Sequence, residues 1–358
     1  MKLKNILYSF MIFIFLASLS SCSRNKQSSP KNEKESGNNE GYLIFINAEA
    51  SNKNILYSID LKEKKKDKVV DKNASSAASS DEKIAFISKD DDGKPSLYTV
   101  KFDGSSLQTV MNGTVINDDS LSWSHDGKKI AFTSQIPPDK GIEVYYVEDG
   151  KYKTPLRVTE DSFINENPAF SGDGREIYYT KNNGSNYDIY KFDVSSGTNR
   201  NISNNPSNDL SLALSFDGTR VFFLSDEAQR GKYDLYAMDM EGQNRIRYTT
   251  GLSIEKGSIN ISPDSSMIAF ITVGDNGSKA VHVIDMKKST IMVSEGGYLS
   301  TWSSDGKKLY FASSNEGKSK IIEFDIETKE MKDILSFDIK PGGESDTIKF
   351  LHFVDKLK

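Results

Sequence analysis

A hairpin motif recurs through most of the chain. The segment LSWSHDGKKIAF at 121–132 contains an apolar run, an Asp-Gly turn and a second apolar run. Asp-Gly between such runs is a strong signal for a tight β-turn, because glycine adopts positive φ without steric cost. A period of this length indicates a repeat architecture in which each unit is one supersecondary element. The aspartates that align, at intervals of 41 to 47 residues, are Asp81, Asp126, Asp173, Asp217, Asp264 and Asp305.

Each repeat predicts four short strands. The aspartate is followed by a β-branched and aromatic run, as in Ile84–Ile87, whose positions are nearly all apolar, so both faces should be buried. A second run ending in Asp follows, clearest in Tyr187–Val194 and Tyr233–Met240, and then a last short strand, as in Arg245–Thr250. Four strands with tight turns and no helical pattern between them predict an all-β fold built from four-stranded antiparallel β-propeller blades.

The two ends of the repeat region complement each other. The first unit opens at Tyr42–Asn47 without a leading strand, and Thr347–Val354 is a strand without a successor. The C-terminal strand is therefore expected to supply the inner strand of the first blade and close the ring. Counting the units predicts seven blades over residues 41–358, with six or eight as alternatives. Stacking around a ring also explains the recurrence, because one four-stranded sheet cannot bury both of its faces alone.

The N-terminus has the layout of a secretory signal. Residues 1–21 place two lysines ahead of an apolar run that is too short and too soon broken by serine for a comfortable membrane span. The exit, Leu19-Ser20-Ser21-Cys22, resembles the bacterial lipobox, whose cysteine is acylated, for example with palmitate, and becomes the new N-terminus. Cys22 is the one cysteine, so it is the predicted lipid attachment site. An ordinary cleaved signal or an uncleaved anchor is the alternative.

Residues 22–40 are predicted to be a disordered tether. From Ser23 to Glu40 the chain has no apolar residue to bury. A flexible chain of about 18 residues spans about 20–25 Å r.m.s.. The tether would hold the folded body off a bacterial membrane, on its extracytoplasmic side.

The repeat resembles a known family. The pattern W-S-x-D-G-K-K-I-A-F, followed by I-Y-x-x-D and then R-x-x-T, is similar to the TolB-like β-propeller repeats, with the best matches at Trp123–Phe132 and Trp302–Phe311. The resemblance covers about residues 42–357 and implies the propeller fold. It implies little about activity, since the same blade occurs in scaffolds, peptidase propellers and lyases. The family's namesake carries an α/β domain ahead of its propeller, which is not expected here because only the polar tether precedes Tyr42.

The residues that most often carry chemistry have structural interpretations. His125 is predicted to face solvent in a turn, and His282 and His352 to pack within strands. Trp123 and Trp302 share one repeat position and are predicted to wedge between blades, with ligand stacking as the alternative. The turn aspartates are expected to hydrogen-bond the local backbone, and their residue type also tolerates the left-handed region. Since neither G-x-S-x-G nor H-E-x-x-H occurs, no catalytic residue and no cofactor are predicted.

Two acidic segments are candidates for a metal site. Asp90-Asp91-Asp92-Gly93 and Asn117-Asp118-Asp119 are the densest carboxylate groups, and neither has the spacing of an EF-hand loop. Solvated loop tips are the interpretation adopted, with a weakly held Ca²⁺ as the alternative, so no metal site is predicted. A net charge of −5 lacks the basic excess of a nucleic-acid binder, and no nucleic-acid partner is predicted.

Three functions remain in competition. The predicted one is a membrane-anchored, non-catalytic propeller that binds an envelope protein or peptide through its loops. A ligand-binding or sensor lipoprotein would use the central channel, and a polar, aromatic-lined channel would favour it. A glycan-acting lyase would require His, Arg and Asp to converge on one face of the ring.

Overall fold

The structure of the chain is a computed structural model. Residues 1–40 fall outside the described residues, and with them the predicted signal peptide, Cys22 and the tether, as do Asp90, Asp91 and Asn117–Asp119. Within the described residues, no helix has the length and apolar character needed to cross a bilayer. The described residues are 41–49, 53–89, 92–113, 121–136, 140–148, 150–151, 154–287, 289–315, 317–339 and 348–355.

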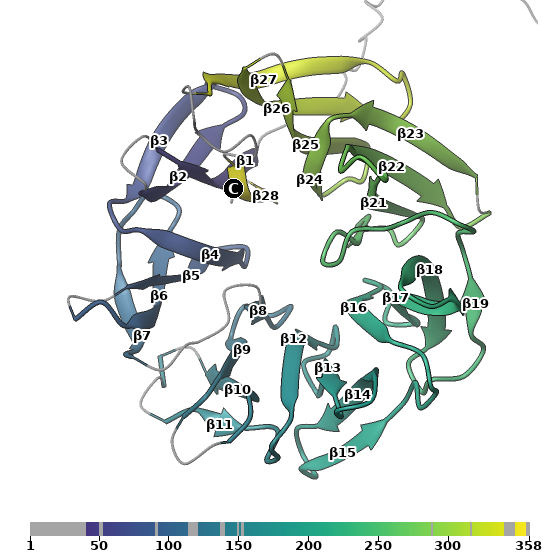
Figure 1. Ribbon diagram of the computed structural model, residues 1–358. Coiled ribbons are helices and arrows are strands. Elements are labelled where there is room, and N and C mark those ends of the chain that lie inside the picture. The colour runs from purple at the N-terminus through teal and green to yellow at the C-terminus, as the bar shows by residue number, and fades with distance from the viewer. Residues whose placement is uncertain are drawn as a thin grey trace, which may run out of the picture. The chain divides into compact units, whose positions relative to one another are not determined.

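Seven four-stranded antiparallel sheets stand around a central channel, which confirms the predicted seven-bladed propeller (Figure 1). We number the blades from the one that contains Gly41, and give the strands of each in order from the channel outwards. Blade 1 is β28 (Ile348–Asp355), β1 (Gly41–Ala48), β2 (Asn54–Asp60) and β3 (Lys65–Val70); blade 2 is β4 (Ala74–Ser79), β5 (Lys83–Lys89), β6 (Pro95–Lys101) and β7 (Gln108–Met111); blade 3 is β8 (Ser122–Trp123), β9 (Lys129–Ser134), β10 (Glu143–Glu148) and β11 (Leu156–Arg157); blade 4 is β12 (Ile164–Phe170), β13 (Glu176–Asn182), β14 (Tyr187–Asp193) and β15 (Thr198–Asn201).

The remaining three blades follow the same plan. Blade 5 is β16 (Asp209–Leu214), β17 (Arg220–Gln229), β18 (Lys232–Asp239) and β19 (Ile246–Arg247); blade 6 is β20 (Asn260–Ile261), β21 (Met267–Val273), β22 (Lys279–Asp285) and β23 (Thr290–Glu295); blade 7 is β24 (Gly297–Trp302), β25 (Lys308–Asn315), β26 (Lys318–Asp325) and β27 (Met331–Asp338).

The C-terminal strand closes the ring as predicted. β28 pairs antiparallel with β1, with Gly41 opposite Asp355 and Ile44 opposite His352. On its other side β28 meets blade 7, where the ring of Phe353 stacks on that of Tyr310 at a centroid distance of 5.6 Å. The first and last segments of the propeller are therefore held in one sheet.

Burial between blades explains why the sheets need one another. In the described part of the chain, the buried apolar residues form seven clusters, and each cluster joins two adjacent blades. Between blades 4 and 5, for example, Tyr178 and Ile189 pack with Phe223 and Tyr236. Full burial of a side chain of this size stabilises a fold by roughly 1.5–3 kcal/mol. One sheet alone would expose both of these faces.

A stacked ring pair repeats within the blades. In register-matched positions of the second and third strands, Phe86 stacks on Tyr98 at 5.4 Å and Phe223 on Tyr236 at 6.0 Å. Blade 6 places Phe270 and His282 at this position, 5.4 Å apart and 9° from parallel. His282 thus stands where other blades have tyrosine.

The Asp-Gly turns share one hydrogen-bond pattern. In blade 4, Ser171 Oγ donates to Asp173 Oδ1 at 2.7 Å, and the carboxylate also accepts from the backbone N–H of Arg175. The predicted role of the aspartate in binding the local backbone is confirmed. The left-handed residue of the turn is the next one, Gly174, with φ 68°, so the aspartate itself does not use that region. The same Ser-to-Asp bond occurs at Asp126, Asp217, Asp264 and Asp305.

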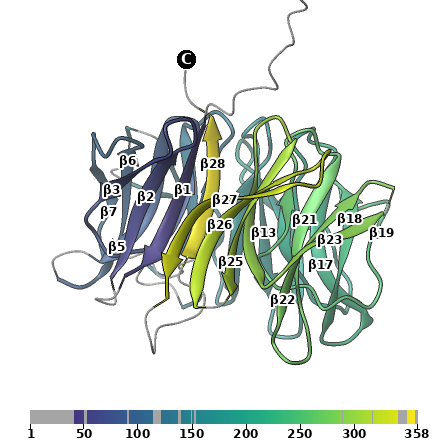
Figure 2. The ribbon, with the colours of Figure 1, turned by 90° about the horizontal axis from the view of Figure 1, so that it is seen from above.

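The alternation of strand direction gives the ring two distinct ends. At the end that we call the turn end, the first strand of each blade joins the second and the third joins the fourth. At the opposite end, the cavity end, the second strand joins the third and the chain passes to the next blade. β1 begins and β28 finishes at the turn end, where Gly41 pairs with Asp355, and Figure 2 shows these strands side by side.

Candidate binding site in the central channel

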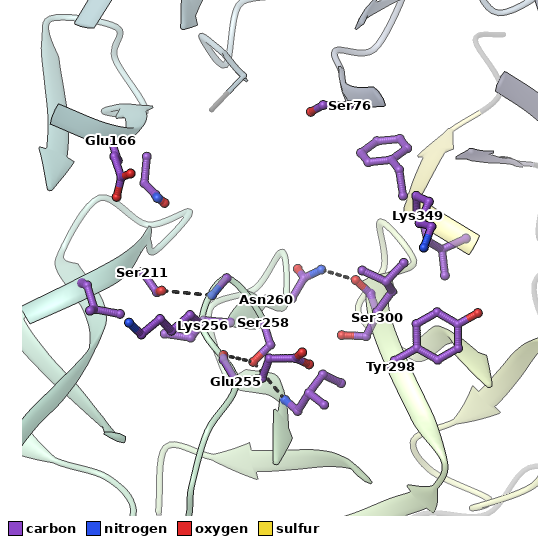
Figure 3. Close-up of a pocket in the computed structure, with 18 of the residues that line it drawn as sticks. Ser76, Glu166, Ser211, Glu255, Lys256, Ser258, Asn260, Tyr298, Ser300 and Lys349 are labelled. Atoms are coloured by element: carbon purple, nitrogen blue, oxygen red, sulfur yellow. Dashed lines mark hydrogen bonds between the residues drawn. The ribbon is translucent and has the colours of Figure 1, made fainter. Parts of the chain in front are cut away.

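A cavity of about 550 Å³ occupies the channel at the cavity end. All seven blades contribute to its wall, mainly through residues at or just before the start of their inner strands. Figure 3 shows Glu166 of blade 4 and Lys349 of blade 1 on opposite sides of the opening. The side chains or backbone that line it include Ser75, Ser76, Leu121, Glu166, Asn167, Thr180, Tyr187, Leu210, Ser211, Glu255, Lys256, Ser258, Asn260, Lys279, Tyr298, Leu299, Ser300, Lys349 and Phe350.

Irregularities in the inner strands shape this wall. The register of five inner strands shifts near their beginning, and a β-bulge re-aims a side chain at such a point. Three of the bulged residues are non-glycine residues in the left-handed region, which L-residues visit at a cost: Asn167 at φ 53°, Ser211 at 54° and Leu299 at 61°. The bulged residues that line the cavity are Ser75, Asn167, Ser211, Tyr298, Leu299 and Lys349.

Blade 6 builds its part of the wall from a loop, because its inner strand β20 spans only two residues. Glu255 N–H donates to the carbonyl of Ile271 at 2.8 Å, and Ser258 Oγ donates to the carbonyl of Glu255 at 2.7 Å. The N–H of Gly257 donates to Ser211 Oγ of blade 5 at 2.9 Å, one of the dashed contacts in Figure 3. These hydrogen bonds hold the loop against β21 of its own blade and β16 of blade 5.

Five charged residues line the cavity. Glu255 and Lys279 form an ion pair at 2.9 Å, with both side chains about one-third exposed. Lys256 is exposed, and its Nζ lies 5.1 Å from the centroid of the Tyr233 ring. The half-buried Glu166 forms no ion pair with any described residue. With Lys349, the wall therefore presents separated charges of both signs to an incoming molecule.

The remaining wall combines hydroxyl groups and rings with aliphatic side chains such as Leu121, Leu210 and Leu299. Asn260 Nδ2 donates to the carbonyl of Ser300 at 2.6 Å across the seam between blades 6 and 7. The hydroxyl of Tyr298 lies 3.1 Å from Ser319 Oγ and accepts from the N–H of Ile348 at 3.3 Å. Ser300 Oγ is buried without a hydrogen-bond partner in the described part of the chain. The channel is thus polar with aromatic patches, the pattern that favours ligand binding.

The histidines lie away from this wall. His125 is exposed in its turn, as predicted. His282 accepts or donates one hydrogen bond with Thr272 Oγ1 at 2.9 Å, and its burial lowers its pKa. Burial lowers the pKa of His352 to about 4, and its ring stacks near Phe350. The predicted packing roles of His282 and His352 are confirmed.

The tryptophans also have the predicted position between blades. Trp302 is 4% exposed, and its Nε1 donates to the carbonyl of Asn260 in blade 6 at 3.0 Å. Trp123 makes the equivalent bond to the carbonyl of Ala78 in blade 2 at 3.1 Å. Each indole therefore wedges into the seam with the preceding blade.

The sequence did not identify the wall residues as a site. Ser75, Ser211 and Leu299 belong to no motif, and the bulges that turn them toward the channel have no signal in the repeat. Among the described residues, no group of three or more His, Cys, Asp or Glu side chains is placed to hold an ion, and most of the two acidic segments considered as calcium sites lies outside these residues. The sequence did offer one indication of these wall residues, which is that they lie just ahead of or within the predicted inner strands.

Comparison with known proteins gives consistent findings. The family model described as TolB beta propeller domain matches residues 83–300. A protein named TolB homolog from Chlorobium luteolum is 26% identical over 163 residues, which are 45% of this chain and 35% of that protein. The matched region thus spans about a third of that relative's length.

Solved structures share the fold. TolB from Acinetobacter baumannii has a TM-score of 0.57 at 18% identity, covering 88% of this chain and 83% of that one. An oligogalacturonate lyase from Vibrio parahaemolyticus has a TM-score of 0.66 at 10% identity, covering 80% and 92%. At these identities the likeness shows the propeller fold alone.

Proposed function

The chain belongs to the TolB beta propeller family, and from this premise we propose that it is a cell-envelope lipoprotein whose non-catalytic propeller binds a protein partner. Acylation of Cys22 would anchor it to a bacterial membrane on the extracytoplasmic side. The partner would present a peptide segment or loop to the cavity of the channel. No cofactor takes part in this proposal.

The seven-blade cavity is the observation that carries the proposal. Its volume of about 550 Å³ lies in the range of pockets that hold a few side chains or a small ligand. It lies at the end where loops connect the blades, and loops on a rigid scaffold are the usual carriers of binding residues. Serine, asparagine and backbone groups offer hydrogen bonds to an extended segment, while Glu166, Lys256 and Lys349 offer charge recognition.

An apolar pair beside the cavity supports a protein partner. Phe163 and Ile164 are each 39% exposed and lie two to three residues before Glu166. Lys181 Nζ is 5.0 Å from the centroid of the Phe163 ring and forms an ion pair with Asp161 at 2.6 Å. Apolar anchors flanked by polar groups are typical of the energetically dominant part of protein interfaces.

The second candidate is binding of a small polar solute in the same cavity. The hydroxyl-rich wall with Tyr187, Tyr298 and Phe350 favours it. This candidate predicts that isolated protein retains a solute, whereas the first predicts capture of one protein.

The test uses the full-length lipoprotein, solubilised from membranes, as bait in envelope extracts. We expect one reproducible protein partner, lost in Glu166→Lys and Lys349→Glu variants. Lys128→Glu, at an exposed position of the turn end, is the matched control and should retain the partner. Recovery of oligosaccharide or a small solute in place of protein would overturn the scaffold proposal. A Cys22→Ala variant tests the anchor separately, since it should leave the membrane fraction.

A further inference from the structure

We infer that the turn end of the propeller is a membrane-facing surface, so that the anchored ring presents its cavity away from the bilayer. The inference rests on the proposed acylation of Cys22 and adds to it an orientation and a contact surface. Neither follows from the presence of an anchor alone.

The path of the chain gives the first argument. The segment that follows Cys22 joins the propeller at Gly41, which lies at the turn end opposite Asp355. The carbonyl of Gly41 accepts a hydrogen bond from Leu61 N–H at 3.0 Å, in the turn between the third and fourth strands of blade 1. The cavity lies at the other end, at the start of the inner strands.

Distance favours this orientation over its inverse. The tether predicted for the 18 residues between Cys22 and Gly41 would span about 20–25 Å r.m.s.. If the cavity end faced the bilayer, Gly41 would stand away from it by the length of β1, whose eight residues extend about 26 Å at about 3.3 Å per residue. The tether would then be stretched to beyond its r.m.s. length. With the turn end on the bilayer it needs no such extension.

The distribution of exposed apolar side chains is the second, independent argument. Among the described residues, six of the nine large apolar side chains that are exposed lie toward the turn end, and Phe163 and Ile164 lie at the cavity end. Met292 pairs with His282 at the middle of β22 and belongs to neither end. Phe216, in the Asp-Gly turn of blade 5, is 56% exposed, and Met331, at the start of β27, is 50% exposed. The turn-end set is Leu107, Leu156, Phe216, Ile246, Ile291 and Met331.

These side chains suit a shallow contact with lipid. Five of the seven blades contribute at least one of them at or next to the beginning of the outer strand, and blade 5 contributes a second one in its Asp-Gly turn. Lysines such as Lys128 and Lys307 are exposed in the Asp-Gly turns of blades 3 and 7 at the same end, where long ammonium side chains can extend to lipid phosphates. Dispersed apolar side chains bind weakly alone, but the acyl chains of an anchor supply the affinity and leave these contacts to set the orientation.

The test measures depth in vesicles of phosphatidylethanolamine and phosphatidylglycerol. The full-length acylated protein is reconstituted with one added cysteine at a time, Phe216→Cys, Met331→Cys or Phe163→Cys, and labelled with an environment-sensitive fluorophore. Acylation occupies the sulfur of Cys22, so the new thiol is the one that reacts. We expect nitroxide-bearing lipid to quench the labels at positions 216 and 331 at least threefold more than the label at 163.

Each other outcome overturns the inference. Equal quenching at the three positions would mean that the ring has no fixed orientation, and stronger quenching at 163 would mean that it is inverted. Disulfide-linked dimers of the Phe216→Cys protein would show that a second copy covers the turn end. Mass spectrometry of the N-terminal peptide separates the two proposals: an unacylated Cys22 defeats the anchor, whereas an acylated protein without the quenching pattern defeats the orientation alone.

A substitution series checks the role of the apolar side chains. Phe216→Ser with Met331→Ser should lower quenching of a label at Leu156→Cys about twofold. Phe163→Ser, at a comparably exposed position of the cavity end, should leave that quenching unchanged. An unchanged signal in the double variant would contradict a lipid contact.

Discussion

The two ends of the ring are made from the same seven repeats, but only the turn end keeps them uniform. Five turns there share the Ser-to-Asp hydrogen bond described for Ser171 and Asp173. At the cavity end, equivalent bulges in five inner strands present a different chemistry in nearly every blade, from Ser75 to Leu299 and Lys349. The fold therefore requires particular residue types at the turn end and permits different residue types at the bulges of the cavity end.

The physical reason is the number of hydrogen bonds that depend on each position. The serine hydroxyl of a turn binds Asp and also accepts from the backbone N–H of the second strand, as Ser171 does from Glu176 at 2.9 Å. Replacing it leaves buried polar groups unpaired. The side chain of a bulged residue such as Asn167 or Lys349 points toward the channel, and the strand pairing does not depend on its identity. Comparing equivalent positions of the repeats thus distinguishes the residues that stabilise the fold from those available for binding.

The largest effect should come from removing the strand that completes the repeat. Ending the chain after Ile339 deletes β28, which leaves β1 without its inner neighbour and uncovers the cluster between blades 7 and 1. We expect loss of cooperative unfolding in thermal circular dichroism. Ending the chain after Asp355 is the control and should melt as wild type. A cooperative transition without β28 would show that ring closure does not hold the fold.

Substituting a single side chain in the seam between blades 7 and 1 should have a smaller effect than deleting β28. Phe353 is 8% exposed and stacks on Tyr310. Phe353→Ala should lower the free energy of unfolding by about 3–5 kcal/mol, because it removes a buried ring and leaves a cavity. Chemical denaturation measures the change, and Phe216→Ala, at an exposed ring, should change it by less than about 0.5 kcal/mol.

The uniform turns should each contribute less than the closing seam. Ser171→Ala removes the hydroxyl that donates to Asp173 and accepts from Glu176 N–H, so it should destabilise the protein by about 1–2 kcal/mol. Ser75→Ala, at the bulge of β4, is the matched control and should have a smaller effect. Equal losses at the two positions in urea denaturation would remove the distinction between the two ends.

The same turns predict a dependence on acid. The hydrogen bond from the Ser124 hydroxyl holds the pKa of Asp126 below its usual value, and that from Ser171 does the same for Asp173. A carboxyl whose folded pKa is lowered stabilises the fold above the ordinary Asp value of about 3.9, and this stabilisation is lost as the pH falls through and below it. An Asp126→Asn, Asp173→Asn variant should therefore lose less stability than wild type between pH 5 and pH 2.5. Parallel losses in urea titrations at each pH would contradict the assignment.

The blades and their turns were predictable because the same residue types recur at regular intervals in the sequence. The turn aspartates and the paired tryptophans gave the blades, and the orphan strand at Thr347–Val354 gave the closure, since ring closure needs one strand from each end. The cavity wall was not predictable. A bulge such as the one at Leu299 arises from how an inner strand fits its neighbour, and the repeat pattern carries no mark of it. The wall of blade 6 is a loop fixed by hydrogen bonds to Ser211 and Ile271. These contacts join residues far apart in the sequence, so no local sequence pattern predicts them.

The smallest effect on stability should come from substituting the charged residues of the cavity. These variants test whether the cavity end serves binding and not the fold. Glu166 forms no ion pair with a described residue, so Glu166→Gln removes a charge and breaks no ion pair in the described part of the chain. The free energy of unfolding should change by less than about 0.5 kcal/mol. Glu255→Gln, which breaks the ion pair with Lys279 at 2.9 Å, is the contrasting variant and should cost up to about 1 kcal/mol. Partner capture should show the reverse order, because the Glu255 carboxylate is already engaged by Lys279. If Glu166→Gln destabilises the protein as much as Ser171→Ala and leaves capture intact, the cavity end serves the fold in the same way as the turn end.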